Sequence, residues 1–313
     1  MSESQTAANV LMIRPARFAG NEQTAGSNKF QQINIATHAD SIQAAALKEF
    51  DALVSALQQA GITVHAFADI PEPYTPDSIF PNNWVSFHAD GTVVLYPMLA
   101  PNRRLERRLD VIEALDLQHG FQVTRTLDLT HREAEGKFLE GTGSLVLDRA
   151  HRVAYACLSP RTDMDVLGEF SQRMDYDIVA FEAFDANGAA IYHTNVLMSV
   201  GENFAAVCLD CIEPARRTAV GDMLRSTGHE VIELSMQQMH NFAGNMLQLR
   251  GQHDSVIAMS DSACRSLDSQ QRATLERHGR IVSVAIPTIE RLGGGSVRCM
   301  IAELHLPGKK LTR

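Results

Sequence analysis

The sequence predicts a single α/β domain in which five similar units close into a ring. One pattern recurs along the 313 residues: a helix, then a short strand, then two apolar runs that resemble a hairpin. The pattern returns roughly every 50 residues, which is typical of a repeat architecture. The last apolar run, 296–306, is the expected partner of the first strand, 9–16, and no Pro/Gly/Ser-rich linker divides the chain. We therefore expect one domain over residues 1–313, with the loops at strand ends supplying the chemistry.

The first unit sets the pattern. Residues 40–61 are predicted to form a helix that Asp40 or Ser41 caps and Gly61 ends. Its apolar face, at three- and four-residue spacing, holds Leu47, Phe50, Val54 and Leu57. A strand is expected at 62–68, and residues 83–98 are predicted to form two strands joined by an Asp-Gly turn.

The remaining units repeat this order. Helices are expected at 102–120, 163–175, 213–228 and 266–279. The strands after them are expected at 121–129, 178–184, 229–235 and 280–286. Paired runs occupy 143–159, 195–210 and 245–260. Five such units around an axis would leave a central channel.

Composition excludes several classes of protein. The hydrophobic fraction of 45% and the charged fraction of 21% are ordinary for a soluble domain. A net charge of −9 argues against a nucleic-acid binder. No apolar run approaches the ~20 residues of a membrane-spanning helix, and no secretion signal is found at the start. We expect a cytoplasmic protein that binds a small molecule, with a homodimer as the assembly to consider.

The cysteines argue for reduced thiols. Their number is odd: Cys157, Cys208, Cys211, Cys264 and Cys299. Cys208 and Cys211 have zinc-ligand spacing, but no second Cys/His pair accompanies them, so buried thiols acting as small hydrophobes are the favoured interpretation. The chain has no phosphate-binding glycine loop, and we expect neither a metal nor a cofactor.

Three residues stand out as candidate reactive groups. Cys299 follows three glycines and a serine, which would open space beside a sulfur nucleophile or only turn the chain. His193 precedes a polar step into an apolar strand, where a histidine is either structural or an acid/base group. Glu140 lies at the mouth of another apolar run, as an exposed turn residue or a buried acid that orients a histidine.

Candidate binding residues lie in three short stretches. "TPDSIFPNNW" carries Asp77, Phe80, Asn82 and Asn83, which either form a turn or line a pocket. Arg103, in "PNRR", and Arg161, in "SPRTD", carry guanidinium groups that suit a carboxylate. Residues 20–31 are polar and glycine-containing, and form either a lid or a solvated loop.

Together these motifs resemble the guanidino-group-modifying enzymes of the pentein fold. That superfamily includes arginine deiminases, dimethylarginine dimethylaminohydrolases and amidinotransferases. The stretches "MIRPARFAGNEQTAGSNKFQ", "DSIFPNNWVSFH" and "YHTNVLMSVG" are most similar to the branch of citrulline-utilisation hydrolases. The resemblance spans almost the whole chain. It implies a five-bladed α/β propeller with pseudo-five-fold symmetry.

The resemblance also implies roles for individual residues. Cys299 matches the nucleophile that attacks the guanidine or ureido carbon, and His193 matches the general acid/base. Glu140 matches the acid of a Leu-Glu-Gly-Gly-Asp stretch, which here is Leu-Glu-Gly-Thr-Gly. Residues that match substrate-binding positions are Asp77, Phe80, Asn83, Arg103, Arg161 and Asn195.

Asn83 and Asn195 depart from the deiminase pattern. Deiminases hold the guanidinium with aspartates at the matching positions. An asparagine is neutral and both donates and accepts hydrogen bonds, so it suits a neutral ureido group better than a cation. The resulting hypothesis is a cysteine-dependent hydrolase that acts on the ureido or guanidino carbon of a citrulline- or arginine-like amino acid. Transfer of the amidino group to a second amine is the alternative reaction, and a catalytically silent binding propeller is the alternative of another class.

Overall fold

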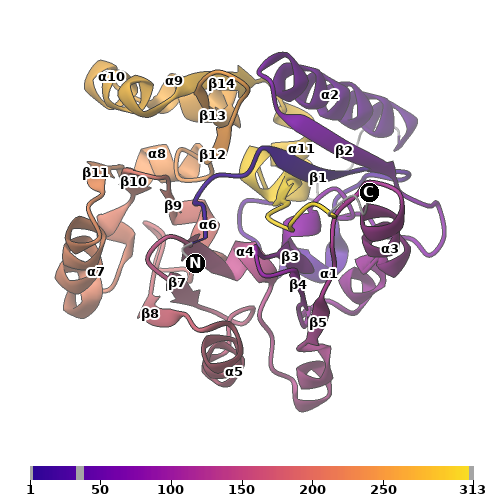
Figure 1. Cartoon of the computed structure of the whole chain (residues 1–313). Helices are drawn as coiled ribbons and strands as arrows, with labels where there is room; N and C mark the ends of the chain where they lie inside the picture. Colours follow the sequence, from indigo (N-terminus) through magenta and orange to yellow (C-terminus); the bar gives the residue numbers. More distant parts are fainter. Residues whose placement is uncertain (1–2, 33–38, 310–313) are drawn as a thin grey trace.

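The computed structural model describes residues 3–32 and 39–309 as five sheets of three strands arranged around an axis (Figure 1). In each sheet an inner strand pairs antiparallel with a middle strand, which pairs parallel with an outer strand. The inner strands are β15 (Ala302–Glu303), β3 (Val85–Phe87), β6 (Leu145–Asp148), β9 (Met198–Val200) and β12 (Leu247–Arg250). The middle strands are β1 (Asn9–Arg14), β4 (Thr92–Leu95), β7 (Val153–Leu158), β10 (Phe204–Val207) and β13 (Ser255–Ser260). The outer strands are β2 (Thr63–Ala68), β5 (Arg125–Asp128), β8 (Asp177–Glu182), β11 (Glu230–Glu233) and β14 (Arg280–Val284).

The first blade closes the ring. Its inner strand β15 comes from the end of the chain and pairs with β1 from the start, with Val10 opposite Glu303. The prediction that the last apolar run pairs with the first strand is therefore confirmed. The Asp-Gly turn is also confirmed, since Gly91 joins β3 to β4 with a φ of 84° that favours glycine.

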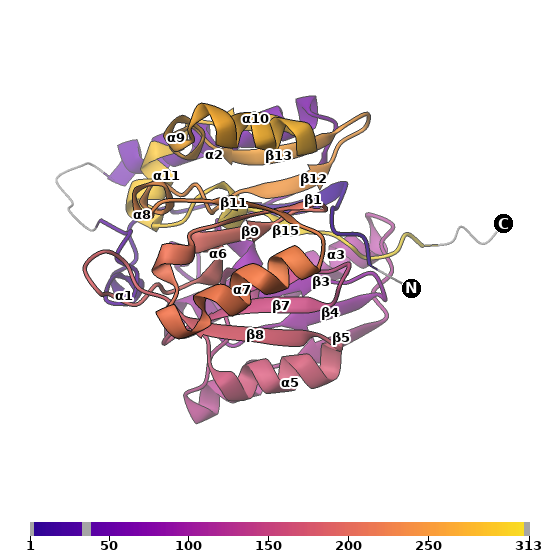
Figure 2. The same ribbon diagram turned by 90° about the vertical axis from the view of Figure 1, so that its left-hand side faces the viewer.

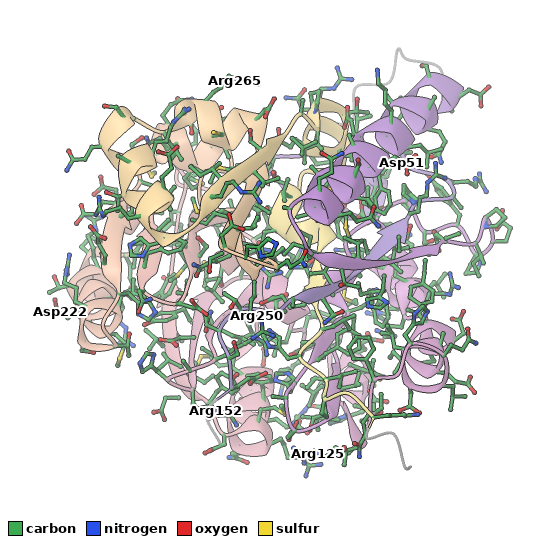
Figure 3. All side chains as sticks on the ribbon, turned by 45° about the horizontal axis from the view of Figure 1, so that its top comes forward. Asp51, Arg125, Arg152, Asp222, Arg250 and Arg265 are labelled. Atoms are coloured by element: carbon green, nitrogen blue, oxygen red, sulfur yellow. The ribbon has the colours of Figure 1, made fainter. Side chains whose placement is uncertain are left out.

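One helix of each blade lies on the outside of the ring (Figures 1 and 2). These helices are α2 (Ala39–Gln59), α3 (Leu109–Leu117), α5 (Met164–Met174), α7 (Pro214–Ser226) and α10 (Ser269–His278). In α2 the apolar face buries Phe50, Leu53 and Leu57, while charged side chains such as Asp51 of α2 and Asp222 of α7 lie on the outer surface (Figure 3). The helix α2 begins at Ala39, ahead of both predicted capping residues, and Gly61 follows its end with a φ of 85°. None of the helices in the described ranges combines the length and the apolar character needed to cross a bilayer.

Short helical turns connect the larger elements. The α-helical turns are α1 (Glu22–Ala25), α4 (Gly141–Ser144), α6 (Thr194–Leu197), α8 (Met236–His240), α9 (Asp261–Ser266) and α11 (Pro287–Gly293). The 3-10 turns are η1 (Pro81–Asn83), η2 (Pro101–Glu106), η3 (Thr130–Glu135), η4 (Leu209–Cys211) and η5 (Val297–Met300).

Two sequence-based predictions of secondary structure are wrong, and both concern the interior. The helix predicted at 102–120 is two elements, η2 and α3, because Arg103 and Glu106 turn inward as a buried ion pair instead of facing solvent. The starts of several predicted inner strands are single helical turns: η1, α4, α6 and η5. In α4, Gly141 has a φ of 46°, and a Cβ there would lie 2.2 Å from the carbonyl oxygen of Asn82 in η1. These turns therefore pack backbone against backbone near the axis, which an extended strand would not allow.

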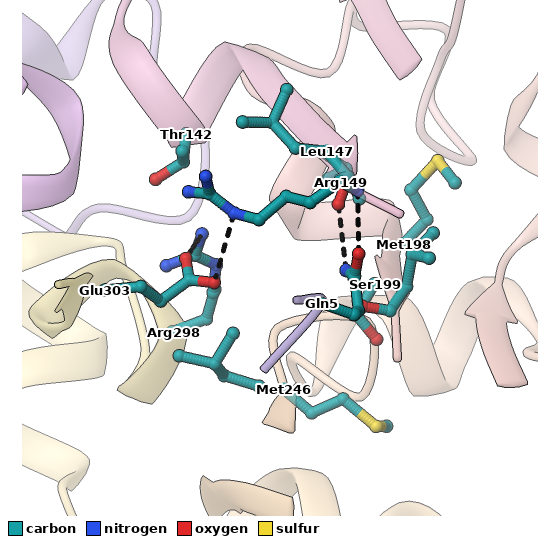
Figure 4. A pocket seen from close by; sticks show the side chains of 12 residues that line it. Gln5, Thr142, Leu147, Arg149, Met198, Ser199, Met246, Arg298 and Glu303 are labelled. Atoms are coloured by element: carbon teal, nitrogen blue, oxygen red, sulfur yellow. Dashed lines mark hydrogen bonds and ion pairs between the residues drawn. The ribbon is translucent and has the colours of Figure 1, made fainter. Parts of the chain in front are cut away.

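The predicted central channel is largely filled. A small cavity remains between the inner strands, and Gln5 beside it donates to the carbonyl oxygens of Leu147 and Val200. In Figure 4 the side chains of Arg149 and Arg298 both point toward Glu303, with Arg298 Nη2 2.6 Å from the carboxylate. The axis is thus held by a buried ion network.

Candidate active site

The helical turns before the inner strands bring the predicted reactive residues to one cavity. Cys299 lies in η5, His193 directly before α6, and Glu140 directly before α4. The cavity is small. Its walls include Asp77, Phe80, Asn83, Arg103, Arg161, Tyr192, His193 and Cys299. Groups that are far apart in sequence meet here because the inner strands start at the same end of the ring, and each group lies just before the start of its strand.

The Cys299 thiol is held by two carboxamides. Asn195 Nδ2 and Asn245 Nδ2 each lie 3.3 Å from its sulfur. Asn245 is itself fixed, since its Nδ2 donates to the carbonyl oxygen of Asn195 and its Oδ1 accepts from the amide of Arg298. Two N–H groups are therefore aimed at the sulfur and hold it in position.

His193 and Glu140 form a buried pair. His193 Nε2 lies 2.9 Å from Glu140 Oε2, and the carboxylate also accepts from Arg161 Nη1 and from the amide of Leu99. Burial would raise the pKa of Glu140, but the charge of Arg161 and the bond to His193 hold it well below its usual range. Burial lowers the pKa of His193 to about 4, although Glu140 opposes this shift. At neutral pH the pair is therefore a carboxylate and a neutral imidazole, which can act as a base.

Arg103 lies at the centre of a second group of charges. Its guanidinium forms a two-point pair with Glu106 at 2.9 Å, donates to Asn83 Oδ1 at 2.9 Å and lies 3.6 Å from Asp77. Burial raises the pKa of Glu106 to about 8, although Arg103 opposes this shift. Burial also raises the pKa of Asp77, against the effects of Arg103 and Asn21. Burial and Arg103 therefore act in opposite directions on both carboxyl groups.

Residues 20–31 pack onto the cavity. Asn21 donates to Asp77 Oδ2 at 2.8 Å, and Asn28 donates to the carbonyl oxygen of Gly294 at 3.2 Å. Arg161 Nη2 donates to Ser27 Oγ at 2.7 Å and to the carbonyl oxygen of Thr24. This segment covers the site, so it is a lid in position and not a solvated loop.

The glycines near Cys299 make room for an aromatic wall. A Cβ at Gly293 would lie 2.7 Å from the Phe80 ring, and one at Gly295 would lie 3.0 Å from that ring and 3.3 Å from Cys299 Cβ. Gly143 serves the histidine in the same way, since a Cβ there would lie 2.7 Å from the His193 ring. The glycines thus admit side chains that shape the cavity.

Several polar atoms at the site have no partner within the described ranges. Asp77 Oδ1, Asn83 Nδ2 and Asn195 Oδ1 are all buried and unpaired there. Buried polar groups normally hydrogen-bond. Two acceptors and one donor beside a thiol are complementary to a small group that carries both N–H and C=O functions.

Sequence reasoning missed Asn245, Glu106 and Asn21. Asn245 had a detectable signal: "GNML" in the fourth unit matches "TNVL" at Asn195 and "RCMI" at Cys299, because all three precede an inner strand. Glu106 had no detectable signal in the sequence, because "RRLERR" has the composition of a solvated helix. Cys208 and Cys211 are buried in the core, as predicted.

Comparison with known families decides the assignment. A profile of the family described as N,N dimethylarginine dimethylhydrolase, eukaryotic, matches residues 14–306. The chain belongs to this family. Membership confirms the predicted relation to the guanidino-group-modifying hydrolases of the pentein superfamily and, with the five sheets, the predicted propeller. A search of curated proteins finds no match.

Solved structures of dimethylarginine dimethylhydrolase type and of related enzymes share this fold. ArgZ, an arginine dihydrolase from the ornithine-ammonia cycle in cyanobacteria, is 16% identical with a TM-score of 0.74, over 96% of this chain and 41% of ArgZ. The chain thus spans about two fifths of ArgZ. The N-terminal domain of ArgZ, solved with a covalently bound reaction intermediate, is 17% identical with a TM-score of 0.72, over 96% of this chain and 99% of that domain. A cysteine-to-serine variant of DDAH from Pseudomonas aeruginosa, in complex with citrulline, is 14% identical with a TM-score of 0.65, over 96% of this chain and 100% of its own.

Proposed function

We propose that the protein hydrolyses a C–N bond at the ureido or guanidino carbon of an arginine-related amino acid, through a covalent intermediate on Cys299. One observation carries the proposal: the Cys299 thiol and the His193–Glu140 pair face the same buried cavity as Asp77. A urea or guanidine carbon is a poor electrophile, so a thiolate that splits the displacement into two steps is the appropriate catalyst. The covalent intermediate in the ArgZ domain supports this route.

The proposed reaction has two steps. Cys299 first passes its thiol proton to the neutral imidazole of His193. The thiolate attacks the central carbon, a C–S bond forms, and the C–N bond to the departing amine breaks as His193 delivers that proton to the leaving nitrogen. Water then attacks the same carbon, His193 takes a proton from the water, and the C–S bond breaks to release the thiolate, which takes the proton back from His193. Glu140 fixes the imidazole throughout, and the ammonia or amine leaves between the steps.

The free polar atoms of the site favour a neutral head group. Arg103 is already paired with Glu106, and Arg161 with Glu140. The free donor Asn83 Nδ2 suits a ureido oxygen, and the free acceptor Asp77 Oδ1 suits its N–H groups. We therefore propose a ureido substrate such as citrulline, with Asn195 and Phe80 beside its reacting end.

An ammonia-release screen tests this function. The substrates are citrulline, arginine, methylated arginines, agmatine and succinylarginine, and Cys299→Ser is the blank. We expect a kcat/KM for citrulline at least ~10-fold above that for arginine, corresponding to roughly 1.4 kcal/mol of discrimination. Arginine turnover equal to or faster than that of citrulline would refute the ureido version.

The two alternatives give other results in the same assay. Amidino transfer would need an added amine such as glycine and would yield a modified glycine in place of ammonia. A silent binding propeller would release nothing, and its Cys299 would react slowly with iodoacetamide at neutral pH.

A further inference from the structure

A second cluster of ligand-type side chains lies at the other end of the propeller. Asp148 ends β6, His151 lies in the turn between β6 and β7, and His229 directly precedes β11. The inner strands begin at the thiol, so the β6–β7 turn and the start of β11 lie at the opposite end of their blades. Arg149, in the same turn, contacts Glu3, which places the cluster near the N-terminus, away from α1 (Figure 2).

The three side chains converge on one point. Their candidate ligand atoms all lie within 4.8 Å of one another. His151 Nδ1 lies 2.9 Å from Asp148 Oδ1, and His229 Nε2 lies 3.8 Å from Asp148 Oδ2. Ligand atoms around a tetrahedral zinc ion lie about 3.4 Å apart, given Zn–N and Zn–O bonds of about 2.0–2.1 Å. The observed separations bracket that value, so small side-chain rotations would complete the geometry.

The hydrogen bonds of His229 leave its Nε2 directed at Asp148. Its Nδ1 lies 3.2 Å from the carbonyl oxygen of Leu224 and 2.9 Å from Thr227 Oγ1, whose own proton is directed at the carbonyl oxygens of residues 223 and 224. Both partners accept, so Nδ1 is the donor and Nε2 faces the buried Asp148 carboxylate at 3.8 Å. A backbone carbonyl on the outer nitrogen is also how proteins orient metal-binding histidines.

Tyr155 adds a buried polar group on the same side of the sheet. Its hydroxyl lies beside Thr227, which is also the partner of His229. Tyr155 pairs with Val146 and Asp148 pairs with Val153, so the two polar side chains lie on one face of the third blade. Burial, and next the charge of Asp148, raise the pKa of this hydroxyl.

We propose that Asp148, His151 and His229 bind a zinc ion that joins the third and fourth blades. Two imidazole nitrogens and one carboxylate oxygen are a usual ligand set for zinc. Asp148 is fully buried, whereas the His151 side chain is 42% exposed, so solvent reaches the fourth coordination position. Because β6 and β11 belong to different blades, the ion acts as a crosslink that stabilises the folded ring.

Zinc titration of EDTA-treated protein tests this site in the Cys299→Ser background, which removes the reactive thiol and keeps the result independent of turnover. We expect one equivalent to bind and to raise the melting temperature. His151→Ala and Asp148→Asn should each weaken binding by at least ~10-fold, and Thr227→Val should weaken it while leaving all three ligands. His131→Ala is the matched control, because His131 is an exposed histidine 3.6 Å from the carboxylate of Glu169.

Cobalt(II) substitution identifies the ligands. Binding at this site gives d–d absorption without a thiolate-to-metal charge-transfer band. Zinc affinity unchanged in His151→Ala, or a charge-transfer band that disappears with Cys208→Ser, would overturn the proposal.

Discussion

His193 Nε2 lies 2.9 Å from Glu140 Oε2, at a point where neither side chain is more than 2% exposed. Arg161 and the amide of Leu99 hold the carboxylate from other directions, so it cannot rotate away. The bond fixes the proton of the neutral imidazole on Nε2 and leaves the other ring nitrogen as a base. The pair therefore fixes which ring nitrogen of His193 can accept a proton.

Replacement of Glu140 by glutamine should lower kcat by ~10²–10⁴-fold. The amide can still accept from His193, but it lacks the charge that stabilises an imidazolium during amine release. The measurement is steady-state ammonia release, with circular dichroism as a check of folding. Glu135→Gln, which changes an exposed carboxylate, should match the wild type. A Glu140→Gln enzyme with wild-type kcat would remove Glu140 from the mechanism.

Replacement of Asn245 should slow the alkylation of the Cys299 thiol. Asn245→Ala removes one of the two N–H groups aimed at Cys299 Sγ, so the thiolate loses a stabilising contact. We expect the rate of iodoacetamide alkylation at pH 7 to fall by ~10-fold. Asn245→Asp should slow it further, because a second negative charge disfavours the thiolate, and raising the pH should restore the rate. Asn187→Ala, at an exposed asparagine, is the control.

The repeated architecture was predictable because it follows from hydrophobic periodicity. Each blade has the same alternation of an amphipathic helix and apolar runs. Because every blade must bury its apolar residues, the pattern is visible in all five units of the sequence. Asn83, Asn195 and Cys299 could also be found, since each stands directly before an apolar run. Only the resemblance assigned them roles, however, because sequence spacing does not show which blades meet at the axis.

The misplaced elements share one physical cause. Arg103 and Glu106 have the sequence pattern of a solvated helix, but their charges are satisfied by each other and by Asp77 inside the protein. Local propensity favours a helix there, and the tertiary ion cluster overrides it. The helical turns before the inner strands were missed for a similar reason, since close backbone packing at Gly141 is a contact between blades.

Glu106 predicts how stability depends on pH. Its pKa is about 8 in the folded protein and 4.5 as the ordinary value, so between these limits the folded state binds more protons than the unfolded state. Stability contributed by this group is therefore lost as the pH rises through that window. His193 acts in the opposite direction, since its lowered pKa makes stability rise between pH 4 and 6.5. Urea unfolding from pH 6.5 to 8 lies above the range in which His193 acts, and comparison with a Glu106 variant separates Glu106 from other raised groups such as Asp77.

In that range Glu106→Gln should flatten the decline of the free energy of unfolding, because the amide stays neutral and still accepts from Arg103. Glu276→Gln, at an exposed carboxylate, should keep the wild-type slope. Parallel curves for the wild type and Glu106→Gln would show that Glu106 is already ionised in the folded protein at pH 6.5.

Asn83 should control which head group the enzyme accepts. Asn83→Asp adds a negative charge beside Arg103 and replaces the free donor Nδ2 with an acceptor. A ureido oxygen loses its donor, whereas a guanidinium gains a counter-charge, so the ratio of kcat/KM for arginine to that for citrulline should rise by ~10-fold or more. Parallel assays of both substrates give this ratio, and Asn187→Asp, at an exposed position, controls for added surface charge. A ratio that falls or stays constant would mean that position 83 does not contact the reacting group, and that the neutral asparagine was selected for its bond to Arg103.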